Sequence, residues 1–202
     1  MRSPETKALK TRSLCLRKNY IPEVISHKIA NRLHWQVAIC DHCAVSEQLK
    51  QVIIYTDGAC TGNPGAGGYG AVLIYGKHRK EISGGYKLTT NNRMEMMAAI
   101  AALQSLKQQC LVTLHSDSKY VVDAVMKGWA KKWQANGWKR NKKEKAKNPD
   151  LWQQLLDLCD KHQVEFVWVK GHVGIPENER CDTLAVAAAR QNNLPDDVGY
   201  FQ

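Results

Sequence analysis

The sequence VIIYTDGACTGNPG, residues 52–65, decides how the rest of the chain folds. It opens with an apolar, β-branched run from Val52 to Tyr55, which predicts a buried strand. Asp57 lies on this strand, and the glycines Gly58, Gly62 and Gly65 predict a tight turn beside it. A carboxylate on a buried strand must be solvated, paired or bound to a metal, because burying it bare is too costly. Taken alone, Asp57 also fits an acid that caps a turn.

Beyond this stretch the hydrophobic pattern changes period several times. Short links predict that the first three strands are antiparallel neighbours, and apolar residues at helical spacing begin after the N-cap candidates at residues 90–92. Strands are predicted over residues 52–60, 69–75, 80–88, 111–115 and 164–169; helices are predicted from about 91 to 107, over 119–127, from Pro149 onward and over 176–190. Strands that alternate with helices after an opening meander predict an α/β fold with a mixed sheet.

Charge and composition narrow the class of partner. The chain has 202 residues, with 29 Lys and Arg against 19 Asp and Glu, a net charge of +10. Such a surplus favours a polyanionic partner, nucleic acid before a membrane. No apolar run approaches the length of a membrane span, and no signal-peptide core begins the chain, so we expect a cytoplasmic protein. The seven scattered cysteines fit free thiols better than a disulfide framework.

Residues 1–50 differ from the rest of the chain, because they are basic and show no sustained periodicity. We expect an N-terminal extension over residues 1–50 and one domain over residues 51–202. One hypothesis is that translation of the natural protein begins at Val45, from a GTG codon; the alternative is a basic arm that adds nonspecific affinity for nucleic acid. Cys40-Asp41-His42-Cys43 resembles half of a zinc site, but no second pair of ligands follows it.

Four acids lie near the ends of predicted elements, namely Asp57, Glu95, Asp117 and Asp182. If the strands next to Asp57 and Asp117 are parallel neighbours, these carboxylates can face each other. Clustered carboxylates raise one another's pKa, and a divalent cation relieves the repulsion. Carboxylates and water are the ligands that Mg²⁺ prefers, and two such ions suit attack of water on a phosphodiester. Taken singly, Glu95 also fits an acid that a helix dipole stabilises, and Asp182 also fits an ordinary surface acid. The pattern therefore suggests a metal-dependent enzyme that acts on nucleic acid, but it leaves these alternatives open.

Four strings resemble type 1 ribonuclease H of the bacterial kind and occur in that family's order: TDGACTGNPGAGGYGAVL, TTNNRMEMMAAIAAL, SDSKYVVDAV and WVKGHVGIPENERCDTLA. The resemblance runs from about Gln51 to Gly199-Tyr200. It implies a ribonuclease H-like fold, with a five-stranded mixed sheet in the order 3-2-1-4-5 flanked by helices. It also implies a monomeric endoribonuclease that cleaves the RNA strand of RNA–DNA hybrids with two metal ions, Mg²⁺ or Mn²⁺, leaving 5′-phosphate and 3′-hydroxyl ends.

The resemblance assigns catalytic roles as well. Asp57, Glu95 and Asp117 would hold the metal core, and Asp182 would complete a second, looser site. His172 would shuttle a proton or help the product leave, a role that suits an imidazole because its ordinary pKa lies near neutrality.

Substrate contacts implied by the resemblance fall mainly around the first and second strings. Short side chains there would meet the minor groove and reach the 2′-hydroxyls that distinguish RNA from DNA. Lys119 stands where the family usually has Gln, which would alter one groove contact and add positive charge. The remaining positions are Cys60, Asn63, Asn91 and Asn92 for the minor groove, Thr90 for a DNA phosphate, and Asn178 near the acids.

Residues 129–147 combine tryptophans with lysines and resemble the family's basic protrusion. Lysines there, Lys147 among them, would neutralise phosphates. We expect Trp129 and Trp133 to meet substrate, with Trp133 facing the DNA strand and at least one other tryptophan buried. The alternative is that these tryptophans are helix core and the lysines a solvated face.

Two rival functions remain at this point. A related nuclease of the same superfold would share the carboxylates but not the strings NNRME and GHVGIPEN. A noncatalytic module that binds RNA–DNA hybrids would have no need of a repulsive acidic cluster, and all four acids are present.

Overall fold

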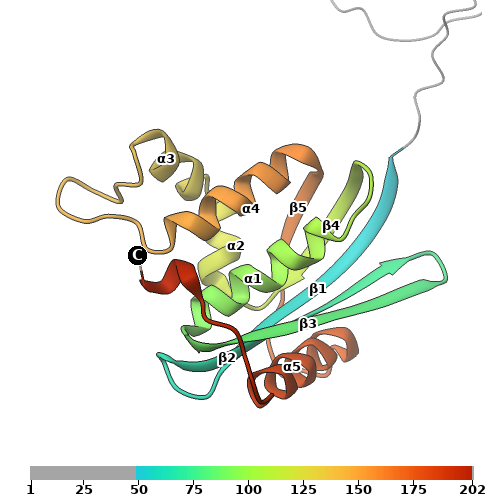
Figure 1. Ribbon diagram of the computed structural model, residues 1–202. Coiled ribbons are helices and arrows are strands. Elements are labelled where there is room, and N and C mark those ends of the chain that lie inside the picture. Colours follow the sequence, from blue (N-terminus) through green and yellow to red (C-terminus); the bar gives the residue numbers. More distant parts are fainter. Residues whose placement is uncertain (1–48, 202) are drawn as a thin grey trace, which may run out of the picture. The chain divides into compact units, whose positions relative to one another are not determined.

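The computed structural model describes residues 49–201 of the chain. The predictions for the N-terminal extension, for a start at Val45 and for Cys40–Cys43 therefore concern residues outside the described part, apart from the last two residues of the extension. No helix among the described residues is long and apolar enough to cross a membrane. Figure 1 shows the elements, which are β1 (Lys50–Cys60), β2 (Gly65–Tyr75), β3 (His78–Thr89), α1 (Asn91–Gln104), β4 (Cys110–Ser116), α2 (Lys119–Met126), α3 (Trp129–Ala135), α4 (Pro149–Lys161), β5 (Gln163–Trp168), α5 (Pro176–Ala189) and the 3-10 helix η1 (Val198–Phe201).

The five strands form one mixed sheet in the order β3-β2-β1-β4-β5, as predicted. β1, β2 and β3 are antiparallel because tight turns join them, whereas β4 and β5 run parallel to β1 because helices provide the crossovers. Gly58 and Gly65, which the sequence placed in a turn, lie in β1 and β2, and the connection between the strands is confined to residues 61–64. The parallel register pairs Thr56 with Ser116, so the residues that follow them emerge side by side.

Helices cover both faces of the sheet. On one face α1, α2 and α4 enclose the main core, where Ile54, Leu114 and Trp152 are fully buried. On the other face α5 packs over β1, β2 and β3 (Figure 1). Close packing there needs glycine on β2, since a Cβ at Gly70 would lie 2.3 Å from the carbonyl oxygen of Cys181 in α5. The sheet is thus a rigid platform whose β1 and β4 carry the acids.

A buried arginine fastens the C-terminal segment to the core. The side chain of Arg93, in α1, is only 2% exposed. Its Nε donates to Asp197 Oδ2 at 2.6 Å, and its Nη2 donates to Asp150 Oδ2 at 2.7 Å. The hydroxyl of Thr89 donates to the same oxygen of Asp197, also at 2.6 Å. These charge-assisted bonds join α1, the start of α4 and the C-terminal segment at one point.

Candidate active site

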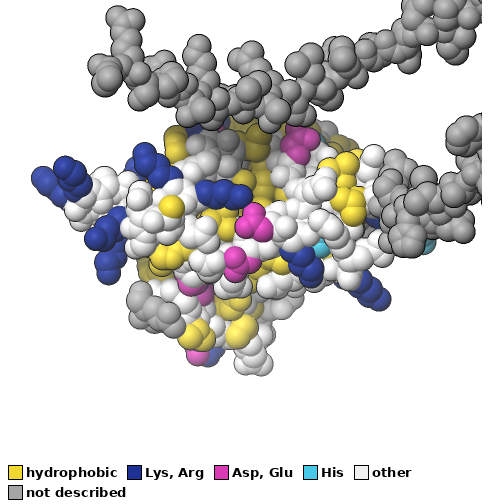
Figure 2. Space-filling model, turned by 90° about the horizontal axis from the view of Figure 1, so that it is seen from above, with side chains coloured by type: hydrophobic (Ala, Val, Ile, Leu, Met, Phe, Trp, Pro, Cys, Tyr) yellow, Lys and Arg dark blue, Asp and Glu magenta, His cyan; other side chains and the backbone are white. Residues whose placement is uncertain are grey.

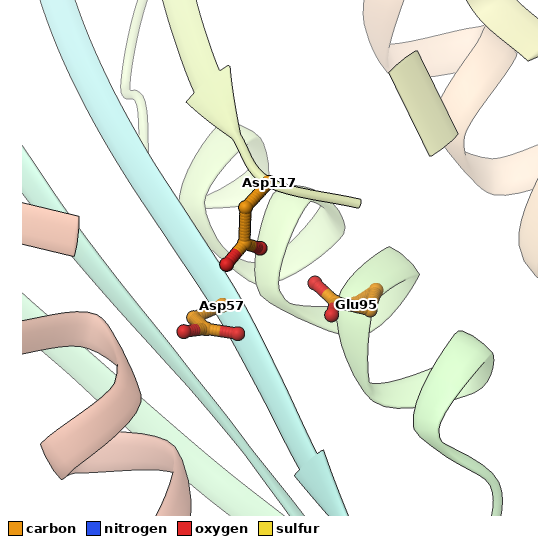
Figure 3. A group of neighbouring side chains, drawn as sticks. All are labelled: Asp57, Glu95 and Asp117. Atoms are coloured by element: carbon orange, nitrogen blue, oxygen red, sulfur yellow. The ribbon is translucent and has the colours of Figure 1, made fainter. Parts of the chain in front are cut away.

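Three carboxylates meet where β1 and β4 come together. Asp57 lies in β1, Asp117 follows the last residue of β4, and Glu95 is the fifth residue of α1. One oxygen of each lies within 4.8 Å of the others, and Figure 3 shows the three side chains pointing toward one another. Because Glu95 lies beyond the first turn of its helix, stabilisation by the helix dipole does not account for its position.

Gly58 allows this approach of α1 to β1. A Cβ at this position would lie 2.3 Å from the backbone nitrogen of Glu95 and 2.6 Å from the carbonyl carbon of Met94. Backbone atoms cannot move aside as a flexible side chain can, so any larger residue would push α1 away from the strand. The glycine after Asp57 therefore sets how close Glu95 comes to the other two acids.

The electrostatics of this group are unfavourable without a counter-ion. Burial, and then the neighbouring Asp117, raise the pKa of Asp57 to about 7, although the backbone N–H of Gly58 donates to its Oδ1 at 2.7 Å. Burial, and then Asp57 and Asp117, also raise the pKa of Glu95 well above its ordinary value. Oε2 of Glu95 is buried and has no hydrogen-bond partner within residues 49–201. A divalent cation would satisfy this oxygen and relieve the repulsion, so the residues present fit a metal site.

Groups from the end of β5, from the loop after it and from the start of α5 surround Asp117. Nδ2 of Asn178 lies 3.5 Å from Asp117 Oδ2, and Oδ1 of Asn178 is buried without a partner among the described residues. A Cβ at Gly171 would lie 2.4 Å from the same carboxylate oxygen. The indole Nε1 of Trp168 donates to the backbone oxygen of Asp117 at 3.1 Å. These contacts restrict the position of Asp117 from the side of β5.

The other two predicted catalytic residues lie outside the group of three. Asp182 is half-buried in α5, and its charge helps to raise the pKa of Asp57. His172 is exposed in the loop between β5 and α5, with a φ of 54°. The structure therefore brings together three of the four acids in direct proximity and places Asp182 within electrostatic reach.

Several predicted substrate residues lie together beside the carboxylates. The backbone N–H of Asn91 donates to Asn63 Oδ1 at 3.2 Å, and Asn91 Nδ2 donates to Glu95 Oε1 at 3.4 Å. The thiol of Cys60 contacts the carbonyl oxygens of Gly65 and Thr89. A cavity of 730 Å³ begins next to these residues, and its lining includes Asn63, Thr90, Asn92, Lys147 and Asn148. Sequence reasoning missed Asn148.

The segment from α3 to α4 forms a second cavity, of 820 Å³. Trp129, Trp133 and Lys147 line it together with Lys132 and Arg140. In Figure 2, Lys and Arg side chains gather at the left of the molecule, where this segment projects in Figure 1. The prediction that a further tryptophan of residues 129–147 is buried is wrong, since Trp129 is exposed and Trp138 is half-buried like Trp133. The fully buried tryptophan is Trp152 in α4, which meets Trp133 edge-on, with 5.8 Å between ring centroids.

Lys119 lies near the acids but contacts an aromatic ring. Its Nζ is 4.7 Å from the ring centroid of Trp168. The same indole donates to the backbone of Asp117, so the lysine and the acid share one neighbour. Sequence reasoning missed Trp168, because an aromatic residue at a strand end carries no signal for this contact.

Comparisons with known proteins agree with this geometry. A family model described as RNase H matches residues 49–190. Ribonuclease H of Rippkaea orientalis is 68% identical over 156 residues, which span 77% of this chain and 96% of the relative. LC9-RNase H1, a type 1 RNase H with the type 2 active-site motif, has a similar crystal structure, with a TM-score of 0.63 and 34% identity over 70% of this chain and 72% of that one. LC11-RNase H1 in complex with RNA/DNA hybrid has a TM-score of 0.51 and 25% identity, covering 68% and 96% of the two chains.

Proposed function

The chain belongs to the RNase H family and is a ribonuclease H that cleaves RNA–DNA hybrids, and we propose that Asp57, Glu95 and Asp117 hold the divalent metal on which cleavage depends. The single observation that carries this assignment is the group of three converging carboxylates, two of them buried. A noncatalytic hybrid-binding module would gain nothing from this repulsion, which costs stability unless a cation is bound.

Mg²⁺ suits this donor set best, with Mn²⁺ as a second choice. All three donors are carboxylate oxygens, and a site with few protein ligands leaves room for the waters and substrate phosphate that Mg²⁺ usually retains. Asp182, which acts on Asp57 electrostatically, would assist a second ion. When bound, such ions activate water and stabilise the leaving oxygen of a phosphodiester, giving 5′-phosphate and 3′-hydroxyl ends.

The residues of the chain itself hold and orient the reacting groups. Gly58 and the Asp117 contacts keep the three carboxylates within reach of one phosphate. His172 stands exposed in its loop, where its imidazole can accept a proton from water or pass one to the leaving group. Asn178 donates toward Asp117 and keeps that carboxylate turned to the site.

The hybrid would run from the carboxylates across the two cavities. Cys60, Asn63, Asn91 and Asn92 would face the minor groove, where amide groups can hydrogen-bond to the 2′-hydroxyls of RNA. Thr90 and Lys119 would contact the backbone near the site. Trp129, Trp133 and Lys147 would receive the DNA strand, because one cavity offers aromatic faces among cationic side chains.

The same observations support a proposal for the oligomeric state and the compartment. All groups of the site come from one described unit, residues 49–201, which supports action as a monomer with this unit as the catalytic domain. The described cysteines Cys60, Cys110, Cys159 and Cys181 are free thiols, which supports a reducing compartment such as the cytoplasm.

A cleavage assay tests the proposal. RNA–DNA hybrid labelled on the RNA strand is incubated with the protein and Mg²⁺, beside duplex DNA, duplex RNA and single-stranded RNA. We expect internal cuts in the hybrid only, and loss of cleavage both in EDTA and in the Asp57→Asn variant. Cleavage that survives this substitution would place the metal elsewhere, and hybrid binding without cleavage in Mg²⁺ or Mn²⁺ would leave only a binding module.

A further inference from the structure

Lys119 brings a positive charge close to the three carboxylates. It is the first residue of α2 and follows Asp117 by two positions, so the Cα atoms of the two residues are at most about 7.6 Å apart. A lysine side chain can span this distance, and an ion pair with the carboxylate of Asp117 is therefore within reach. Such a pair would compete with a divalent cation, because it puts a positive charge on a proposed metal ligand. Where the ammonium group lies thus matters for the metal site.

Neither the helix nor an acid holds this ammonium group. A cation at the first residue of a helix faces the positive end of the helix dipole, which disfavours it there. No salt bridge within residues 49–201 includes Lys119. Its side chain is exposed, and its Nζ is 4.7 Å from the ring centroid of Trp168. The aromatic face of this indole is therefore the attractive partner of the ammonium group in the described part of the chain.

Trp168 is held in a fixed orientation beside the acids. It is the last residue of β5 and pairs with Ser116 of β4, the residue before Asp117. The backbone N–H of Val169 donates to the carbonyl oxygen of Ser116 at 3.0 Å, which continues this pairing past the end of the strand. The indole Nε1 donates to the backbone oxygen of Asp117 at 3.1 Å. The ring is thus fixed along its N–H edge, while 44% of the residue remains exposed and accessible to Lys119.

We propose that Trp168 is a positioning residue for the metal site, because it holds the ammonium group of Lys119 on its ring and keeps it off the carboxylate of Asp117. This role rests on the proposed function, since it matters only if Asp117 binds the divalent cation. A cation–π contact at an exposed position corresponds to about a two- to fivefold preference for one side-chain position over another. The contact leaves Asp117 free for the metal and keeps the positive charge beside the path of the hybrid.

A titration of the full-length, metal-free protein with Mg²⁺ tests this role without hybrid and without cleavage. Binding is followed by NMR at the backbone amide of Gly58, which donates to Asp57 Oδ1 and so reports on the site. Trp168→Leu removes the aromatic face and the indole N–H, and it should weaken Mg²⁺ binding about two- to fivefold. Trp168→Phe keeps an aromatic face but loses the N–H, and its affinity should stay within about twofold of the parent's. In the Lys119→Gln background, Trp168→Leu should no longer weaken Mg²⁺ binding, because the competing charge is gone.

The matched control is Tyr75→Leu, which removes an aromatic face under another lysine. Lys50 Nζ lies 5.6 Å from the ring centroid of Tyr75, and Tyr75 is 43% exposed, much like Trp168. Tyr75 follows Gly70, the residue of β2 that pairs with Asp57, by five positions, which corresponds to roughly 17 Å along the strand. The control should therefore change the affinity for Mg²⁺ by less than about twofold.

Other outcomes overturn the positioning role of Trp168. An affinity of Trp168→Leu like the parent's would show that the ring does not protect the site. An undiminished effect of Trp168→Leu in the Lys119→Gln background, or an equal loss in Trp168→Phe, would assign the effect to the lost hydrogen bond to Asp117. An equal loss in Tyr75→Leu would show that the effect is not specific to the site. In each of these cases the parent still binds Mg²⁺, whereas failure of the parent to bind it up to about 50 mM would overturn the proposed metal site as well. Trp168→Met, which also lacks a ring, serves if the leucine variant does not fold.

Discussion

The substitution Asp57→Asn should stabilise the metal-free protein at alkaline pH while it abolishes cleavage. The pKa of Asp57 is raised from 3.8 to about 7, so between these values the folded protein keeps a proton that the unfolded chain has released. The free energy of unfolding therefore falls as the pH rises from 3.8 to about 7. Above pH 7 the ionised carboxylate of Asp57 lowers the free energy of unfolding by its full amount. A shift of this size corresponds to about 4 kcal/mol. This figure is an upper value, because burial of the amide in the variant is also costly.

The assay is urea unfolding in EDTA, followed by circular dichroism. Near pH 8 the free energy of unfolding of Asp57→Asn should exceed that of the parent protein by about 2–4 kcal/mol. Near pH 4 the difference should be far smaller, because the folded protein keeps the proton on Asp57 and only about half of the unfolded chains have released it. The matched control is Asp157→Asn, which removes the same charge from an exposed position in α4. Mg²⁺ should stabilise the parent and not the variant. Equal stability of parent and variant near pH 8, or an equal gain in the control, would refute the reasoning from burial and repulsion.

The remaining predictions concern catalysis and packing. Glu95→Gln should lower the single-turnover rate of hybrid cleavage at least about a hundredfold, since the metal would lose a carboxylate ligand. Asp182→Asn should lower this rate only about tenfold and should raise the Mg²⁺ concentration needed for cleavage, since Asp182 lies outside the group of three carboxylates. Gly58→Ala should also lower the rate about a hundredfold, because its Cβ would displace the backbone of Glu95; a rate like the parent's would contradict this. Arg93→Ala should lower the free energy of unfolding in urea by about 3–5 kcal/mol, since it leaves the carboxylate of Asp197 buried and unpaired, and an unchanged unfolding midpoint would contradict that role.

Local patterns predict much of this fold, because strand alternation, helical spacing and turn residues act over short ranges. The four acids were found because each lies in or directly after a predicted strand or helix and within a string that resembles the family. Asp117 follows the end of β4, whereas Asp57, Glu95 and Asp182 lie inside β1, α1 and α5. The start of β2 was placed at residue 69, but the strand begins at Gly65. Glycine-rich sequence has low strand propensity. Only the packing of α5 explains why β2 has glycine there, because a Cβ at Gly68 would lie 2.2 Å from the carbonyl oxygen of Ala185. Trp168 and Asn148 were missed for a similar reason, since their partners are remote in the sequence.

Helix α1 shows why the active site keeps its negative charge. It carries a buried cation, Arg93, two residues before Glu95, and a free arginine so close would neutralise the carboxylates and compete with a metal. The structure prevents this, because Asp197 and Asp150 together bind Nε, Nη1 and Nη2 of that guanidinium. The arginine is thus neutralised by acids outside the site, and Oε2 of Glu95 is left buried with no hydrogen-bond partner in the described part of the chain. The same helix therefore strengthens the fold at Arg93 and, two residues later at Glu95, maintains an unrelieved repulsion that a divalent cation can remove.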